Sequence, residues 1–148
     1  MNTIAAEGAR SAMGRDRVLH YQIAGLLLLG GHRPDEAAAA LRSAQVTPYD
    51  FPRNNLELGR ALLLAGEPRE AVHVLQAGVR GEMSAGGLYA TKTELHELLG
   101  QAFEAAGEGD SAAAHYRWAL GAWRSADAEF APRVRRIRER LAAIEPLH

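Results

Sequence analysis

Three eight-residue stretches of this chain carry a glycine at the same fifth place. They are YQIAGLLL at 21–28, NLELGRAL at 55–62 and HELLGQAF at 96–103. Glycine inside such a run of helix-forming residues costs about 1 kcal/mol relative to alanine. Because that cost recurs at three matching places, we expect each helix to need a point at which it carries no side chain.

The sequence after each glycine repeats as well. Gly25 and Gly59 lie 34 residues apart, and Gly59 and Gly100 lie 41 apart, where the glycine-rich stretch 81–87 absorbs the additional seven. Twelve residues after each glycine stands an alanine, in the order Ala37, Ala71, Ala112. Four residues later stands a larger side chain, in the order Leu41, Leu75, Tyr116. This order predicts hairpins in which glycine on the first helix faces alanine on the second, so that the two backbones approach closely.

Helical periodicity dominates the chain, and the alternation typical of strands is nearly absent. Prolines beside acidic residues mark helix starts, because proline is tolerated in the first turn and acids suit the positive end of the helix dipole. These prolines are Pro34, Pro52, Pro68 and Pro132. Thr91 and Glu94 have the spacing of a capping box. Together the signals predict helices at 17–31, 34–47, 53–66, 68–80, 92–107, 111–125 and 131–144, with a short one near 3–13.

This combination of positions resembles the tetratricopeptide repeat family, whose unit of 34 residues is a helix–turn–helix. The Leu-Gly pairs at 58–59 and 99–100 match the family pattern, 24–25 matches it in part, and Phe103 and Tyr116 stand at its aromatic positions. Asn55 and His96 replace the first large residue of the pattern, and its closing proline occurs only in the first unit, as Pro48. The resemblance implies an all-α right-handed superhelix of three helix hairpins followed by a capping helix.

The predicted organisation has three parts. Residues 1–17 are an N-terminal segment that includes the short helix, and residues 18–128 hold the repeats as 18–51, 52–85 with an insertion to about 92, and 93–128. Residues 129–148 form an amphipathic capping helix, since a repeat array needs a terminal helix with one polar face. The apolar stripe of this helix is Phe130, Val134, Ile137, Leu141, Ile144.

Composition excludes several classes of function. The net charge is −1 and there is no cysteine, so neither the charge balance nor thiolate chemistry indicates nucleic acid or a bound metal. The six histidines never recur at i, i+4, and no serine has the setting of a hydrolase nucleophile. The arginines of the capping helix are diluted by Glu139 and Glu145 and lack interleaved aromatic residues, which argues against nucleic acid. We therefore expect no catalysis, no cofactor and no metal.

The apolar run at 23–31 is too short to span a bilayer, and HRPDE follows it where a signal peptide would have small residues. We therefore expect a cytoplasmic protein with no membrane partner. Abundant alanine, with arginine in place of nearly all lysine, is typical of a GC-rich bacterial genome.

The resemblance implies that the first helices of the hairpins line a concave groove. At 100° per residue, the face about 80° around from each glycine holds positions six and three before it and one and four after it. These residues are Leu19, Gln22, Leu26 and Leu29 in unit one, Arg53, Leu56, Arg60 and Leu63 in unit two, and Glu94, Glu97, Gln101 and Glu104 in unit three. The face thus runs from apolar through basic to acidic. The acids in unit three argue against the mode in which family members grip a peptide's terminal carboxylates.

The function predicted from these features is a non-catalytic protein–protein interaction, in which the groove binds a peptide or helix of another protein. We expect Gln22, Leu26, Arg53, Arg60, Glu97 and Gln101 to make contacts, with Arg53 and Arg60 binding acidic groups of the partner. The apolar residues of unit one are either core covered by residues 1–13 or an open end that receives a partner.

Two alternatives stay open. The apolar stripe of unit one could pair two copies in a homodimer or a larger scaffold. The third unit and cap also resemble the helical tails of bacterial signalling and transcriptional regulators, which would make the chain a detached regulatory segment.

Overall fold

A computed structural model describes residues 14–45, 52–81, 90–125 and 127–145, and these residues are helical with no strand among them. The helices are α2 (Gly14–Gly30), α3 (Pro34–Ser43), α4 (Pro52–Leu64), α5 (Pro68–Arg80), α6 (Lys92–Ala105), α7 (Gly109–Ala122) and α8 (Ala131–Ile144), with a short 3₁₀ helix η2 (Ala128–Phe130) before α8. The short helix expected near 3–13 lies outside the described residues.

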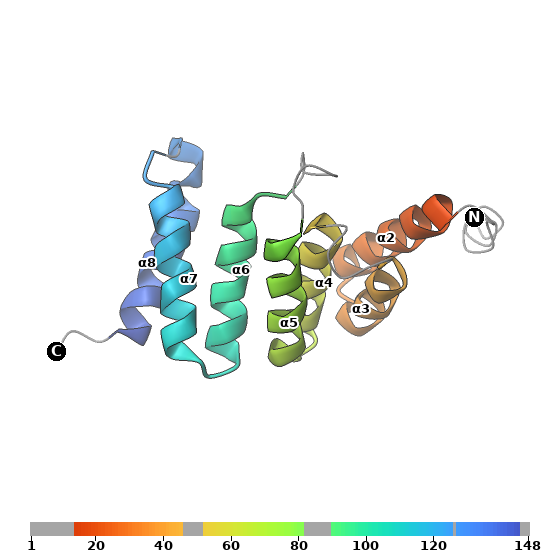
Figure 1. Cartoon of the computed structure of the whole chain (residues 1–148), viewed down its shortest axis with the longest axis horizontal. Coiled ribbons are helices and arrows are strands. Elements are labelled where there is room, and N and C mark those ends of the chain that lie inside the picture. The colour runs from red at the N-terminus through yellow and green to blue at the C-terminus, as the bar shows by residue number, and fades with distance from the viewer. Residues whose placement is uncertain (1–13, 46–51, 82–89, 126, 146–148) are drawn as a thin grey trace.

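The helices form three antiparallel hairpins, α2/α3, α4/α5 and α6/α7, which stack into a right-handed superhelix that α8 closes by packing on α7. In Figure 1 the helices follow one another in chain order along the long axis, with α2 and α8 at opposite ends. Within this stack α4 also contacts α6 directly. The first helices of neighbouring hairpins therefore share a surface on one side of the molecule.

Local chemistry explains where the helices begin. Proline occupies the first turn of α3 and α5, where its missing N–H needs no partner. At α6 the predicted capping box forms: Thr91 Oγ1 accepts a hydrogen bond from Glu94 N at 3.1 Å, and Glu94 Oε2 accepts one from Thr91 N at 3.0 Å.

Each hairpin turn contains a residue in the left-handed backbone region, seven places after the repeated glycine. Gly66 and Gly107 have φ of 80°, and His32, which is exposed, has φ of 57°. The left-handed residues end the first helices, so the expected ends of α4 at 66 and of α6 at 107 are each two residues too late. The expected range 111–125 for α7 is shifted as well, because that helix begins at Gly109 and ends at Ala122.

The repeated glycines sit where the two helices of each hairpin are closest. A Cβ atom added at Gly25 or Gly59 would lie 2.5 Å from Cγ of Leu41 or Leu75, and one at Gly100 would lie 2.5 Å from Cδ1 of Tyr116. The expected alanine partner is wrong in detail, since the nearest side chain comes from the larger residue four places further on. Glycine thus makes room for a large side chain on the second helix. The alanines at the neighbouring places, Ala37, Ala71 and Ala112, are fully buried beside it.

Polar contacts join the first hairpin to the second. Asn54 Nδ2 donates to the carbonyl of Leu41 at 3.0 Å, and Gln45 Nε2 donates to Asn55 Oδ1 at 2.9 Å. On the surface, Arg42 of α3 donates to Glu70 of α5 at 2.8 Å, and this hydrogen bond lowers the pKa of the Glu70 carboxyl. Asn55, at the first large position of unit two, is therefore buried and also connects the two units through a hydrogen bond.

Candidate protein-binding groove

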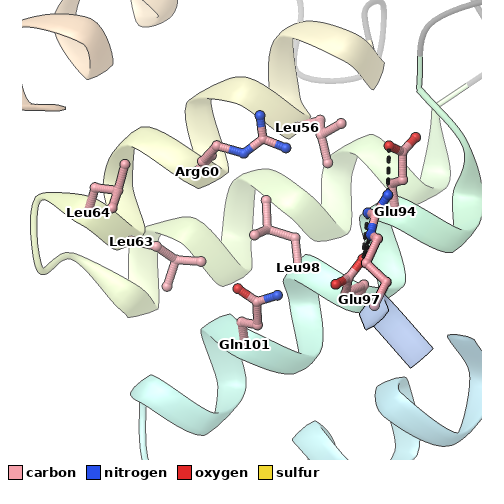
Figure 2. Close-up of a pocket in the computed structure, with 9 residues that line it drawn as sticks. Leu56, Arg60, Leu63, Leu64, Glu94, Glu97, Leu98 and Gln101 are labelled. Atoms are coloured by element: carbon pink, nitrogen blue, oxygen red, sulfur yellow. Dashed lines mark hydrogen bonds and ion pairs between the residues drawn. The ribbon is translucent and has the colours of Figure 1, made fainter. Parts of the chain in front are cut away.

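A hollow of about 430 Å³ lies between α4 and α6, on the side where these two first helices meet. Figure 2 shows the side chains of both helices converging on it. The described residues that line it are Leu56, Arg60, Leu63 and Leu64 of α4, Glu94, Glu97, Leu98 and Gln101 of α6, and Arg133 of α8. We call this hollow the α4/α6 groove.

Four of the nine described residues that line the α4/α6 groove are leucines. Leu56 and Leu98 are buried, whereas Leu64 at the end of α4 is 64% exposed. A second hollow of about 200 Å³, lined by Leu29, His32, Pro34 and Leu64, adjoins it at Leu64. An apolar surface therefore continues from the α4/α6 groove toward the end of α2.

Glu57 of α4 is a buried acid that the sequence analysis did not single out. Its side chain is 3% exposed, and it pairs with Arg53 at 2.9 Å and with Arg60 at 2.8 Å. Both arginines expected to bind a partner's acids therefore already share one acid of their own helix. Arg53 does not line the groove, whereas Arg60 does, with its side chain 47% exposed.

Arg133 of α8 closes one end of the groove over the acids of α6. Its Nε and Nη2 donate to Glu97 Oε2 at 2.9 and 2.5 Å, and its Nη1 lies 3.5 Å from Glu94 Oε1. The dashed lines at Glu94 and Glu97 in Figure 2 are these ion pairs. Its guanidinium also lies over the Trp123 ring, 4.8 Å from the centroid. Glu97 is 6% exposed, and an acid buried to that extent needs such a partner.

A second arginine–glutamate pair repeats this contact seven residues further along both helices. Arg140 Nη1 donates to Glu104 Oε2 at 2.8 Å, and the Tyr116 hydroxyl donates to the same oxygen at 2.6 Å. Burial, together with this hydrogen bond, raises the pKa of Tyr116 well above its usual value. Glu104 therefore belongs to the contact between α6 and α8 and is not among the residues that line the groove.

The expected contact residues of unit one lie apart from the α4/α6 groove. Leu19 is 45% exposed and Leu26 36% exposed on α2, Gln22 is half-buried there, and Leu29 lines the smaller hollow. The structure therefore brings together Leu56, Arg60, Leu63, Glu94, Glu97 and Gln101 from the predicted face, while the α2 residues and Arg53 lie outside that hollow.

Two signals in the sequence could have revealed the missed residues. Arg53, Glu57 and Arg60 have the i, i+4 and i, i+3 spacings of helical ion pairs. The interval from Glu97 to Arg133 equals that from Glu104 to Arg140, 36 residues in each case. The second signal becomes visible once α8 is treated as the first helix of a further unit.

A cluster of rings joins α6 to α7 outside the groove. Nδ1 of His96 lies 2.8 Å from Nδ1 of His115, and the His96 ring stacks on Trp118 with centroids 3.8 Å apart. Burial, the neighbouring His115 and Lys92 lower the pKa of His96 to about 4, and burial lowers that of His115. Both rings are therefore neutral at pH 7, which allows one Nδ1 to donate to the other.

Neither a metal cluster nor a membrane-spanning helix is found in the part of the chain that the structure describes. There, no three histidine or carboxylate side chains gather in a way that could hold an ion. No helix in the same residues has the length and hydropathy needed to cross a bilayer.

The three stacked hairpins with a closing helix define a tetratricopeptide-like fold, and solved structures of that fold superpose on the chain. SycD, the type III secretion translocator chaperone of Yersinia enterocolitica, does so with a TM-score of 0.70 at 16% identity, over 88% of this chain and 84% of SycD. SycD in complex with a peptide of the translocator YopD gives 0.69 at 16% identity, over 87% and 92%. MamA gives 0.70 at 16% identity, over 95% of this chain and 72% of MamA.

No family model matches the sequence, and no curated protein matches it. At 16% identity, the likeness to SycD and MamA establishes the fold of this chain and nothing more specific.

Proposed function

We propose that this protein is a non-catalytic interaction module that binds a peptide segment of a partner protein in the α4/α6 groove. The observation that carries the proposal is the groove itself, a hollow of about 430 Å³ whose lining combines four leucines with two arginines and two glutamates. Apolar side chains of a partner would fill the space between Leu63, Leu64 and Leu98, and polar groups around them would fix the orientation.

The comparison with SycD supports this proposal. A protein of the same fold forms a complex with a peptide of its translocator, which shows that the architecture can hold a peptide. Leu64 adds a further argument, because a leucine that is 64% exposed at the rim gains burial when a ligand covers it.

Selection from a random library of 12-residue peptides displayed on phage tests the proposal without a known partner. Enriched peptides are then synthesised with a fluorescent label, and their affinity is measured by anisotropy. We expect Leu64→Asp to weaken binding by about tenfold, since it removes an apolar contact of roughly 1.5 kcal/mol. The fold should be unaffected, because the side chain is largely exposed.

Leu27→Asp is the matched control, since Leu27 is also an exposed helical leucine, at 72%, and does not line the groove. It should leave the affinity within about twofold of the original. Failure of the library to enrich any peptide, or equal losses in both variants, would contradict binding in the groove.

Arg60→Gln is the sharper probe of the expected acid-binding role. Reversing the charge of both Arg53 and Arg60 would leave the buried Glu57 facing two further acids and would destabilise α4. Arg60→Gln keeps the pair between Arg53 and Glu57, so a loss of affinity for acidic peptides can be assigned to the groove.

A further inference from the structure

The charged residues of the α4/α6 groove have unequal numbers of free hydrogen-bonding groups. Two arginines and two glutamates line it, so its formal charge is balanced. Oxygen Oε2 of Glu94 accepts from Thr91 N and Oγ1 at 3.0 and 3.1 Å, and its Oε1 faces Arg133 at 3.5 Å. Glu97 is buried under Arg133. Both acids are therefore engaged inside the chain.

Arg60 is different. It uses Nη1 for Glu57, and the described residues provide no further hydrogen bond to its guanidinium. Its side chain is 47% exposed, whereas that of Glu97 is 8% exposed. The charged group best placed to meet a ligand in this groove is therefore a cation, although the sequence of α6 contributes acids to the same face.

We propose that Arg133 sets the charge preference of the groove, so that it selects peptides in which an acidic residue lies beside apolar ones. This inference rests on the proposed peptide binding. Arg133 engages Glu97 and Glu94, which reduces the negative charge that these two carboxylates would otherwise present to a basic peptide. The more exposed Arg60 can then attract an acidic peptide. Because Arg133 belongs to α8, the capping helix determines specificity at a site formed by α4 and α6.

The test compares peptide selection on three proteins: the original chain, Arg133→Gln and Arg140→Gln. Arg140 is the matched control, because it forms the equivalent pair with Glu104 seven residues away and does not line the groove. Two labelled peptides then share one apolar core and carry either two glutamates or two lysines beside it.

We expect the original chain and Arg140→Gln to bind the glutamate peptide about fivefold more tightly than the lysine peptide, and Arg133→Gln to reverse that order. The difference should shrink at high salt, because exposed charges are screened. If Arg133→Gln keeps the preference for glutamate, or if Arg140→Gln changes it equally, the inference is wrong while peptide binding stands. If no peptide binds the original chain, the proposed function itself is wrong.

Glu97→Gln tests the same inference in the opposite direction. Without the Glu97 carboxylate, Arg133 pairs with Glu94 alone and the groove becomes more positive. The preference for the glutamate peptide should therefore grow by about twofold. A shift toward the lysine peptide would overturn the assignment. Far-UV circular dichroism and the melting temperature of each variant show whether α8 remains folded.

Discussion

The first and third hairpins have the same interior and different edges. In both, a glycine of the first helix lies against a large residue of the second, Gly25 against Leu41 and Gly100 against Tyr116. Two residues after the glycine, however, Leu27 of α2 is 72% exposed, whereas Ala102 of α6 is fully buried. The second helix of the preceding hairpin, α5, packs on α6, and among the described residues no helix precedes α2. The interior of a hairpin is thus encoded within its unit, and the burial of its edge depends on its neighbour.

The opposite end of the stack is closed. Ile137 of α8 is 1% exposed, and Arg133 and Arg140 pair with acids of α6. The two ends therefore differ in chemistry: α8 presents a polar outer face, while α2 presents leucine and isoleucine. In a repeat array such an outer polar face keeps the last unit soluble.

Gly59→Leu should have the largest effect on stability, because it disrupts the close glycine contact that the hairpins share. The added side chain would overlap Leu75, because even a Cβ at residue 59 would lie 2.5 Å from Leu75 Cγ. We expect the free energy of unfolding to fall by about 3 kcal/mol, measured by urea denaturation. A loss below about 1 kcal/mol would mean that α4 and α5 can separate enough to accommodate the leucine, so that close packing would not explain Gly59.

Gly121→Ala is the control for that substitution. Gly121 also lies in a helix, but a Cβ there would meet nothing within 4 Å. It should be neutral or stabilise the protein by up to about 1 kcal/mol. If both glycines respond alike, helix propensity and not close packing explains them.

Acidification should weaken the third hairpin, because the paired rings of His96 and His115 join its two helices, α6 and α7. Burial lowers the pKa of His96 from 6.5 to about 4, so the unfolded chain takes up this proton more readily than the folded one. The contribution is complete above pH 6.5 and is lost as the pH falls toward 4. We expect a loss of about 1 kcal/mol, well below the full value of the shift, because the ring is partly exposed.

Comparison of unfolding free energies at pH 7 and pH 4.5 measures this effect. Other groups also take up protons on acidification, so the relevant quantity is the difference between the original chain and His96→Gln. The substitution should reduce the loss on acidification. Equal pH dependence in the two proteins would contradict a neutral histidine pair.

The repeated architecture was predictable because its signals are local. Glycine at three matching places and proline at the helix starts depend on backbone sterics, which a sequence displays directly. The turn at Gly66 follows from the same chemistry, since glycine readily adopts positive φ. The residue that each glycine contacts was harder to predict. Ala71 and Leu75 lie on the same side of one helix, and the sequence does not show which of them contacts Gly59.

The ionic part of the site could be predicted only incompletely. From the sequence, a glutamate such as Glu57 is expected to face solvent. In the structure, however, packing buries Glu57 between two arginines. Arg133 reaches Glu97 only because α8 returns along α6, and that placement depends on tertiary packing. The binding role of Arg60, Glu97 and Gln101 stays a prediction, and the peptide selection tests it.

The smallest effect concerns the exposed edge of α2 and tests whether another segment or molecule covers that edge. Leu27→Gln should change the free energy of unfolding by less than about 0.5 kcal/mol, because the leucine is 72% exposed and glutamine is an equally good helix former. Ala102→Gln, at the matching place in α6, should cost more than about 2 kcal/mol, since that site is fully buried. If Leu27→Gln also destabilises strongly, or lowers the mass measured by light scattering from dimer to monomer, something covers α2. The edge of the first unit would then be an interface, as the edges of α4 and α6 are.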